Sequence, residues 1–475
     1  MARFLPYLMH YMLRFFCVFC LLGFLLGSLS LDAQTNVNFD SLQTVIDRYP
    51  TEDTVKARML INFANDIRKT DQIRGLAAAE QAIALAERLH QPLLVARAYV
   101  AKGNNLFNQR HPIEGIAIIQ QALQIFEVQK SDFWAATTAL RIGDLSSAIS
   151  QYDTAKEFCQ KAEKSFKKLG SQSNLAKCYN CLAVATIQLG ENEDALTYLN
   201  MSHGINLSIN NAQGLIGDYN NYGFLYANLA NFTKALEYYH KSLTLNEKTG
   251  SKADLAHVYS NISGVFFRLN DISKSLEYDS KALEIYQENN MEMQVGACYV
   301  NMATKYKEMR NYDKALEYNL TGKSILEPLG AQQFLAICIS NIGATYIDMK
   351  DFVKAYPYQI EALQMFEAMK NDAEIARIKY NLAAIIFGAS DDDLQHLGIQ
   401  HENRKALSES YAVDCIKIGE ESGSVIYVQK GHKILSQIYE NNGDYINALK
   451  AFQHFIVLRD STSGECSENC VNQIF

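Results

Sequence analysis

Five asparagines recur at intervals of forty residues, and their amide side chains are the clearest chemical groups in this chain. They are Asn221, Asn261, Asn301, Asn341 and Asn381, each followed by one apolar and then one small residue. A primary amide can donate to a backbone carbonyl and accept from a backbone N–H at once, which suits an extended peptide. The pattern therefore predicts a row of groups that bind the main chain of another protein.

These asparagines have a second interpretation, in which they are an inherited feature of a solvated repeat surface. Recent duplication of one repeat would explain five copies without any ligand. However, asparagine in a helix interior costs about half a kcal/mol relative to alanine, whereas a hydrogen bond to a peptide would contribute about 0.5–1.5 kcal/mol. Retention of this residue at one position in five repeats therefore favours binding.

Catalytic and metal-binding chemistry is poorly represented in the sequence. The segment 390–403 gathers five residues that could ligate a divalent metal: Asp391, Asp392, Asp393, His396 and His401. A polar, glycine-containing loop of this kind is more often simply solvated, so we expect no metal and no cofactor. The chain carries no HExxH pair, phosphate-cradling glycine loop or nucleophile elbow. We therefore expect a protein that is not an enzyme and has no small-molecule substrate.

The composition argues against a nucleic-acid partner. The net charge is −8, and no block of like charges occurs, whereas a nucleic-acid-binding domain needs a basic surface. With 48% hydrophobic residues and only 6 prolines, the chain can bury a large core and shows few signals of disordered linkers. The expected partner is a protein or a peptide.

A pair of small residues in each period indicates what the repeat is built from. The first falls two residues after each asparagine, as in Gly223, and the second follows twelve residues later, as in Ala235. A short polar turn lies between them and contains a residue such as Asp271, which can cap a helix N-terminus. Apolar residues at three- and four-residue spacing flank this turn, so each repeat is predicted to be a pair of antiparallel helices. About ten pairs are expected within 56–461, with an insertion at 390–403 between the two helices of repeat nine.

The spacing of Gly223, Tyr226, Ala235 and Tyr239 resembles the small–aromatic–small pattern of tetratricopeptide repeats. The forty-residue period is similar to that of the longer-helix members of the family. The resemblance implies an all-α fold, a right-handed superhelical solenoid of about ten helix pairs whose first helices line a concave groove. The asparagines resemble the asparagine ladder of O-linked N-acetylglucosamine transferase and of kinesin light chain, where such residues hold peptide main chain.

A helical wheel at 100° per residue places each asparagine about 160° from the small position that faces the partner helix. The wheel puts His257 and Arg268 beside Asn261, and it puts Arg377 beside Asn381. The candidate peptide-binding residues are therefore the five asparagines with His257, Arg268 and Arg377. Four tyrosines on the packing side are predicted to be core residues: Tyr226, Tyr306, Tyr346 and Tyr439.

Residues 1–33 have the composition of a signal peptide. Two arginines precede an apolar run, and Ser30 and Ala33 are alternative cleavage positions. The protein is therefore expected to be exported, periplasmic or extracellular in a bacterium, with a membrane contact only if this segment stays uncleaved. Residues 34–55 would lead into the repeats, and residues 462–475 would form an irregular tail.

The cysteines are predicted to be mostly buried thiols. Cys178, Cys298 and Cys338 occupy one repeat position at which a small buried residue fits. In an exported protein, Cys159 could form a disulfide with either Cys178 or Cys181 on a neighbouring helix.

The chain also resembles the exported tetratricopeptide region found ahead of histidine kinase or DNA-binding modules in bacterial signalling proteins. We predict a non-enzymatic scaffold that binds extended peptide segments in its groove. The alternative is the sensory part of a truncated histidine kinase or transcriptional regulator, since residues 455–461 (FIVLRDS) resemble the start of a connector. No coiled coil connector and no effector module are expected within this chain.

Overall fold

The structure, a computed structural model, describes residues 39–109, 111–249 and 252–463. All regular structure in these residues is helical, which confirms the predicted all-α class. No helix of the described residues combines the length and apolarity that crossing a membrane requires. The predicted signal peptide, residues 1–33, lies outside the described residues.

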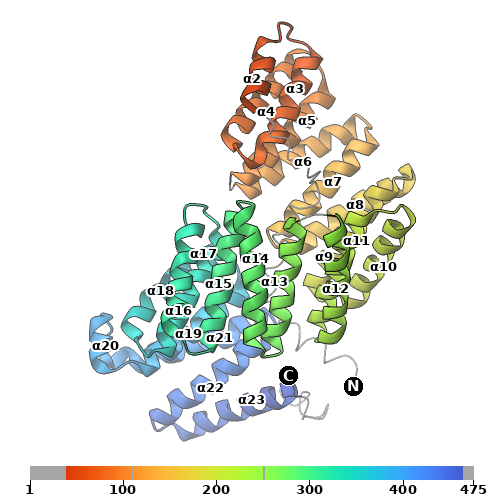
Figure 1. Ribbon diagram of the computed structural model, residues 1–475. Helices are drawn as coiled ribbons and strands as arrows, with labels where there is room; N and C mark the ends of the chain where they lie inside the picture. Colours follow the sequence, from red (N-terminus) through yellow and green to blue (C-terminus); the bar gives the residue numbers. More distant parts are fainter. Residues whose placement is uncertain (1–38, 110, 250–251, 464–475) are drawn as a thin grey trace. The chain divides into compact units, whose positions relative to one another are not determined.

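Ten consecutive helix pairs follow α2 (Phe39–Arg48), and each pair is one repeat (Figure 1). Repeats one to five are α3 (Thr54–Asp66) with α4 (Gln72–Arg88), α5 (Pro92–Asn108) with α6 (Pro112–Val128), α7 (Asp132–Ala148) with α8 (Tyr152–Leu169), α9 (Gln172–Leu189) with α10 (Asn192–Ser208), and α11 (Ala212–Asn228) with α12 (Phe232–Thr249). Repeats six to ten are α13 (Lys252–Arg268) with α14 (Ile272–Glu288), α15 (Glu292–Glu308) with α16 (Tyr312–Leu326), α17 (Gln332–Asp348) with α18 (Phe352–Ala368), α19 (Asp372–Gly388) with α21 (Arg404–Glu421), and α22 (Val425–Asn441) with α23 (Tyr445–Ser463).

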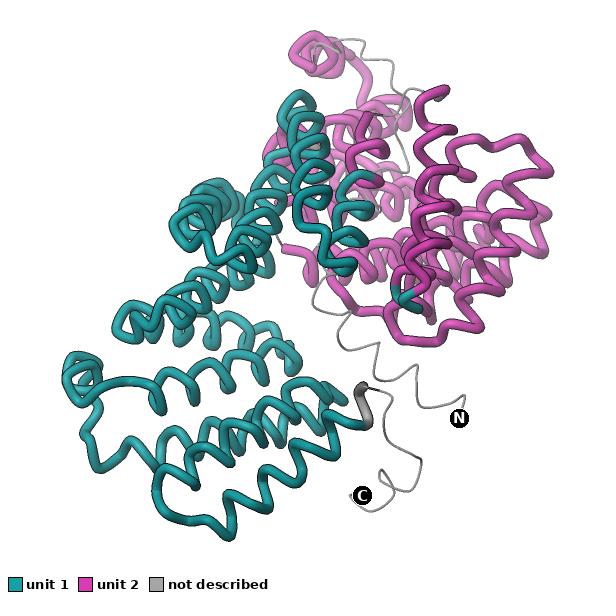
Figure 2. The backbone as a smooth tube through the Cα atoms, turned by 60° about the horizontal axis from the view of Figure 1, so that its bottom comes forward, with its two compact units in different colours: residues 1–19, 228–230, 259–475 teal, residues 20–227, 231–258 magenta. Residues whose placement is uncertain are grey.

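The described residues divide into two compact units, which Figure 2 shows in different colours. The N-terminal unit holds residues 39–227 and 231–258, and the C-terminal unit holds residues 228–230 and 259–463. The division falls inside α13. Four of the five periodic asparagines therefore belong to the C-terminal unit, and Asn221 alone belongs to the N-terminal unit.

The polar turn between the two helices of a repeat works as the sequence predicts. Asp271, Asn311 and Asp351 each accept a hydrogen bond from the backbone N–H three residues later, at 3.1, 3.3 and 3.2 Å. These bonds satisfy one of the N–H groups that have no partner within the second helix. The residue just before each cap has a positive φ of 60°, 57° and 60°, respectively, which ends the first helix and reverses the chain.

The two small positions touch each other where the helices of a repeat cross. In repeat six, Ser263 Oγ donates to the carbonyl of Ser275 at 2.9 Å, and Ser275 Oγ donates to the carbonyl of Ser263 at 2.9 Å. In repeat five, a Cβ on Gly223 would lie 2.5 Å from the ring of Tyr239. Small side chains are therefore required here because the helix backbones approach each other closely.

The four tyrosines predicted to be core residues are only partly buried, so this prediction is wrong in degree. Three of them lie against an aromatic residue of the second helix of their pair, and Tyr439 instead donates a hydrogen bond to Glu409 Oε1 at 2.7 Å. Tyr226 stacks on Tyr238 with ring centroids 5.5 Å apart, and Lys234 Nζ lies 4.9 Å from the Tyr226 centroid. The same arrangement of two rings and a lysine recurs in repeats six, seven and eight. The partly exposed tyrosines are Tyr226, Tyr306, Tyr346 and Tyr439.

The insertion, the lead-in and the start of the predicted tail contain helical residues. The insertion at 390–403 forms α20 (Asp391–His396), capped by Ser390, and a 3-10 turn (His401–Asn403). Leu394 anchors α20 with an exposed fraction of 1%. The lead-in at 34–55 contains α2, and α23 continues to Ser463 rather than ending at 461. The remainder of the predicted tail, residues 464–475, lies outside the described residues.

Candidate functional site

The first helices of consecutive repeats in the C-terminal unit form one continuous layer. Helix α15 contacts α17, α17 contacts α19, and α19 contacts α22. Residues at the same register of these helices therefore follow one another across the layer. The periodic asparagines occupy such a register, the tenth residue of each of α15, α17 and α19.

Three asparagines of this layer are partly exposed, and we call Asn301, Asn341 and Asn381 the asparagine row. Asn341 Nδ2 donates to Thr304 Oγ1 of the preceding first helix at 3.4 Å, which links the asparagine-bearing faces of α15 and α17. Asn381 Nδ2 donates to Gln359 Oε1 of α18 at 3.2 Å. The Asn301 amide makes no hydrogen bond to a described residue, so both its donor and its acceptor are available.

The other two predicted asparagines are buried. Asn221 is 4% exposed in the N-terminal unit, and Asn261 is 5% exposed in the C-terminal unit. The Asn221 Nδ2 group finds no hydrogen-bond acceptor among the described residues. An unsatisfied buried amide of this kind costs about 1–3 kcal/mol. The structure therefore groups three of the five asparagines on an accessible surface and separates the other two from it.

The predicted flanking residues have different environments. His257 is 5% exposed, and burial lowers its pKa to about 4, so it is neutral at physiological pH. Arg268 is partly exposed. Arg377 is 7% exposed, and its guanidinium binds Glu374 Oε2 through Nη2 at 2.5 Å and through Nε at 2.8 Å. Arg377 therefore already has a carboxylate partner on its own helix.

The same register in the N-terminal unit holds no second row of amides. Repeat three places Arg141 there, with its Nε donating to Asn104 Oδ1 at 2.8 Å. Burial lowers the pKa of Arg141 to about 10 and raises that of Asp144 to about 6. Repeat four places Cys181 there, in a disulfide with Cys159. Cys181 is thus the partner of Cys159, and Cys178 is a free buried thiol.

A buried ion pair lies one helical turn from the row and could not be recognised from residue types alone. Lys305, four residues after Asn301, places Nζ 2.5 Å from Asp279 Oδ2 of α14, and both side chains are 1% exposed. Burial raises the pKa of Asp279, while Lys305 opposes that shift. The forty-residue spacing does hold a signal, since the equivalent positions one repeat earlier are Tyr239 and Val265, which are both buried and uncharged.

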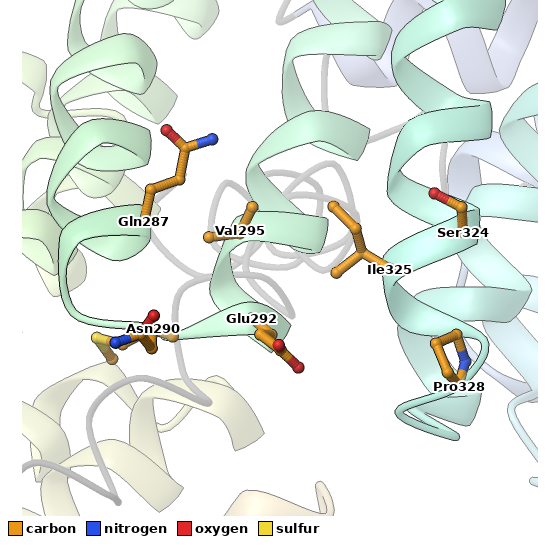
Figure 3. Close-up of a pocket in the computed structure, with 8 residues that line it drawn as sticks. Gln287, Asn290, Glu292, Val295, Ser324, Ile325 and Pro328 are labelled. Atoms are coloured by element: carbon orange, nitrogen blue, oxygen red, sulfur yellow. The ribbon is translucent and has the colours of Figure 1, made fainter.

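A shallow pocket of about 400 Å³ lies beside the end of α16 (Figure 3). Helix α16 has 15 residues and ends at Leu326, two residues before Pro328, whereas α14 has 17 residues. Val295 and Ile325 line this pocket together with Glu292. The pocket contains no residue of the asparagine row, and no three metal-ligating side chains of the described residues come together anywhere in the fold.

Comparison with known proteins identifies the repeat. Residues 219–288 match the family model of the tetratricopeptide repeat. No sequence among curated proteins matches the chain. The match lies in repeats five and six, which are therefore similar to tetratricopeptide repeats.

Three solved structures are similar to this chain at low sequence identity. A signal transduction ATPase with numerous domains and a tetratricopeptide repeat sensor, from Pyrococcus horikoshii, is 17% identical with a TM-score of 0.51; the alignment covers 76% of this chain and 54% of that chain. The apo quorum sensor NprR from B. thuringiensis is 12% identical with a TM-score of 0.43, covering 86% and 100%. The apo form of RapI is 14% identical with a TM-score of 0.45, covering 61% and 99%.

Proposed function

We propose that this tetratricopeptide repeat protein is a non-enzymatic scaffold that holds an extended segment of a partner protein against its asparagine row. The observation that carries the proposal is the shared register of Asn301, Asn341 and Asn381 on three first helices in contact, each with its side chain partly exposed. An amide at this position can bind the main chain of a segment without regard to its side chains. The neighbouring residues would then select among sequences.

The dimensions of the row suit a short peptide. Packed helix axes lie about 8–10 Å apart, so three successive first helices place the outer amides about 20 Å apart. Extended chain rises about 3.3 Å per residue, and the row would therefore cover about six residues. Three amides that each contribute about 0.5–1.5 kcal/mol give modest affinity after the ordering cost of the segment. Reversible binding is the expected mode.

Export of the protein is part of the same proposal. The Cys159–Cys181 disulfide supports it, because disulfides persist mainly in oxidising compartments. The alternative function is the sensory part of a signalling protein. The description of the Pyrococcus ATPase assigns a sensor role to its tetratricopeptide repeats, which is the role that this alternative would give to the present chain.

A library of random nine-residue peptides, panned against the immobilised protein, tests the proposal. We expect the wild type to enrich peptides, and the triple variant Asn301→Ala/Asn341→Ala/Asn381→Ala to bind them about tenfold more weakly or worse. The control is Glu284→Ala/Gln364→Ala, which changes exposed residues of second helices. Circular dichroism establishes that all proteins keep their helices. Equal binding by the triple variant would show that the row is not the peptide site.

A further inference from the structure

The last described helix, α23, exposes large apolar side chains along one face. They follow one another at spacings of four, three and four residues, which places them within about 60° of one another on a helical wheel. The first three are 70%, 58% and 47% exposed, in chain order, and the fourth is partly exposed. We call these four residues the terminal stripe: Tyr445, Leu449, Phe452 and Ile456.

The register of Phe452 is buried in the four preceding repeats. The equivalent residues of repeats six to nine are at most 1% exposed: Asp279, Asn319, Gln359 and Ala412. The first helix of the next repeat makes contacts at this register. Asp279 binds Lys305 of α15 at 2.5 Å, and Gln359 Oε1 accepts a hydrogen bond from Asn381 of α19 at 3.2 Å. The terminal stripe is therefore a surface on which another helix would pack.

The two ends of the helical array differ in how they are covered. At the first end, α2 packs against α3 and buries Ile46. At the other end, α23 packs against α22, and no further helix of the described residues covers the terminal stripe (Figure 1). The terminal units of soluble repeat arrays need a polar outer face, whereas this face is apolar. A large apolar patch that stays exposed marks an interaction site.

The terminal stripe is complementary to a second copy of itself. Its spacing is the same in both directions, with the midpoint between Leu449 and Phe452. Two α23 helices packed antiparallel about this point would place Leu449 of each copy against Phe452 of the other. Tyr445 would then meet Ile456 in the same way. A contact between identical surfaces of this kind is the isologous interface of a twofold dimer.

Charge and area are both compatible with this pairing. The same register would place Arg459 and Asp460, which bind each other at 2.7 Å, opposite Asn442 and Asn441, so no like charges meet. At about 200 Å² for a large apolar side chain, the exposed parts of the stripe and of the neighbouring Ile446 amount to about 500 Å² per copy. A pair would bury about 1,000 Å², which is the area at which specific interfaces begin.

We infer that the terminal stripe binds the terminal stripe of a second copy, with the two α23 helices antiparallel, so that the protein is a twofold dimer. The stripe lies on a second helix, whereas the asparagine row lies on first helices. This inference is therefore independent of the proposed function. A dimer of this kind would carry two asparagine rows.

Sedimentation velocity of the whole chain over a series of concentrations tests the inference. We expect a reversible equilibrium between monomer and dimer for the wild type. Leu449→Glu/Phe452→Glu should raise the dissociation constant at least about a hundredfold, because four carboxylates would enter an apolar contact. The matched control is Met201→Glu/Leu207→Glu, which places the same charges at two exposed apolar positions of α10 and should dimerise like the wild type. Circular dichroism establishes that both variants keep their helices.

Disulfide trapping tests the antiparallel register. Chains with Tyr445→Cys are mixed with chains with Ile456→Cys, both also carrying Cys466→Ser/Cys470→Ser, and oxidised mildly. We expect mass spectrometry to find position 445 of one chain linked to position 456 of the other.

Several results would overturn the inference. They are a wild type that stays monomeric at every concentration, a dimer that Leu449→Glu/Phe452→Glu leaves unchanged, and links between two copies of position 445, which indicate parallel helices. Open-ended oligomers would also overturn it, because they require a head-to-tail contact instead of an isologous one.

Discussion

Gly143 in α7 lies directly against the sulfur of Cys159, which is bonded to Cys181, so no Cβ fits between the helix and the disulfide. The small residue of repeat three thus faces a covalent link rather than another side chain. Gly143→Ala should lower the free energy of unfolding by about 1–3 kcal/mol through overpacking, as measured by urea denaturation.

The control for this substitution is Gly204→Ala. Gly204 lies inside α10 with open space around its Cβ position. Alanine there should raise the free energy of unfolding by about 0.5–1 kcal/mol, because glycine loses more backbone entropy in a helix. Effects of the same sign for the two variants would contradict the close contact at Gly143.

The disulfide itself should contribute to stability. Cys159 and Cys181 are 22 residues apart, and closing a loop of this size stabilises a fold by about 3 kcal/mol in the chain-entropy description. Cys159→Ala/Cys181→Ala should lose about this amount in urea denaturation and should become insensitive to reductant. Peptide mapping under non-reducing conditions should recover the two cysteines as one linked pair. Recovery of both as free thiols would refute the pairing and weaken the case for export.

The buried pair of Lys305 and Asp279 should be intolerant of single changes. Lys305→Met leaves the Asp279 carboxylate without its partner at 1% exposure, and removing one member of such a pair costs about 3–5 kcal/mol. Asp279→Leu/Lys305→Leu should recover most of this loss, because the equivalent positions two repeats earlier hold Leu199 and Leu225, both buried. Denaturation midpoints of the three proteins measure the difference. A double variant as unstable as the single one would refute this account of the pair.

Acid should destabilise the N-terminal unit through His257. Its pKa is about 4 in the folded protein and 6.5 in the unfolded chain. Between these values the unfolded state binds a proton that the folded state does not, so the free energy of unfolding falls as the pH falls from 6.5 to 4. The full effect is about 3 kcal/mol at about 1.4 kcal/mol per pKa unit. His257→Gln should show a shallower decline over this window, and an unchanged slope would contradict the burial of a neutral imidazole.

The local structure of this protein is predicted well from the sequence because each repeat carries its own cap and contact residues. The caps at Asp271, Asn311 and Asp351 and the contact of Ser263 with Ser275 depend on residues within one helix pair, so their spacing alone reveals them. The insertion in repeat nine is predicted to be a loop, but the structure forms a short helix there. This helix begins at a capping box formed by Ser390 and Asp393, and so short a signal is easily missed in the sequence.

The candidate site could be predicted only in outline. A helical wheel states where Asn261 and Asn301 point relative to their own helices, and it gives them the same direction. Asn261 is nevertheless 5% exposed whereas Asn301 is partly exposed, so direction on the wheel alone does not determine exposure. The disulfide partner of Cys159 could not be chosen from the sequence for a similar reason. Cys178 and Cys181 both lie on α9, and the packing of α8 against α9 brings Cys159 to Cys181.

The ion pair between α14 and α15 also makes the junction of repeats six and seven different from the equivalent junctions before it. The equivalent positions in the two preceding repeats hold Tyr239 with Val265 and Leu199 with Leu225, all buried and uncharged, so a crossover that removes forty residues between those repeats would join compatible side chains. A crossover that removes residues 280–319 would instead place Thr345, which has no positive charge, opposite Asp279 in the position of Lys305. A loss of forty residues across this junction would therefore leave the Asp279 carboxylate buried without its cation.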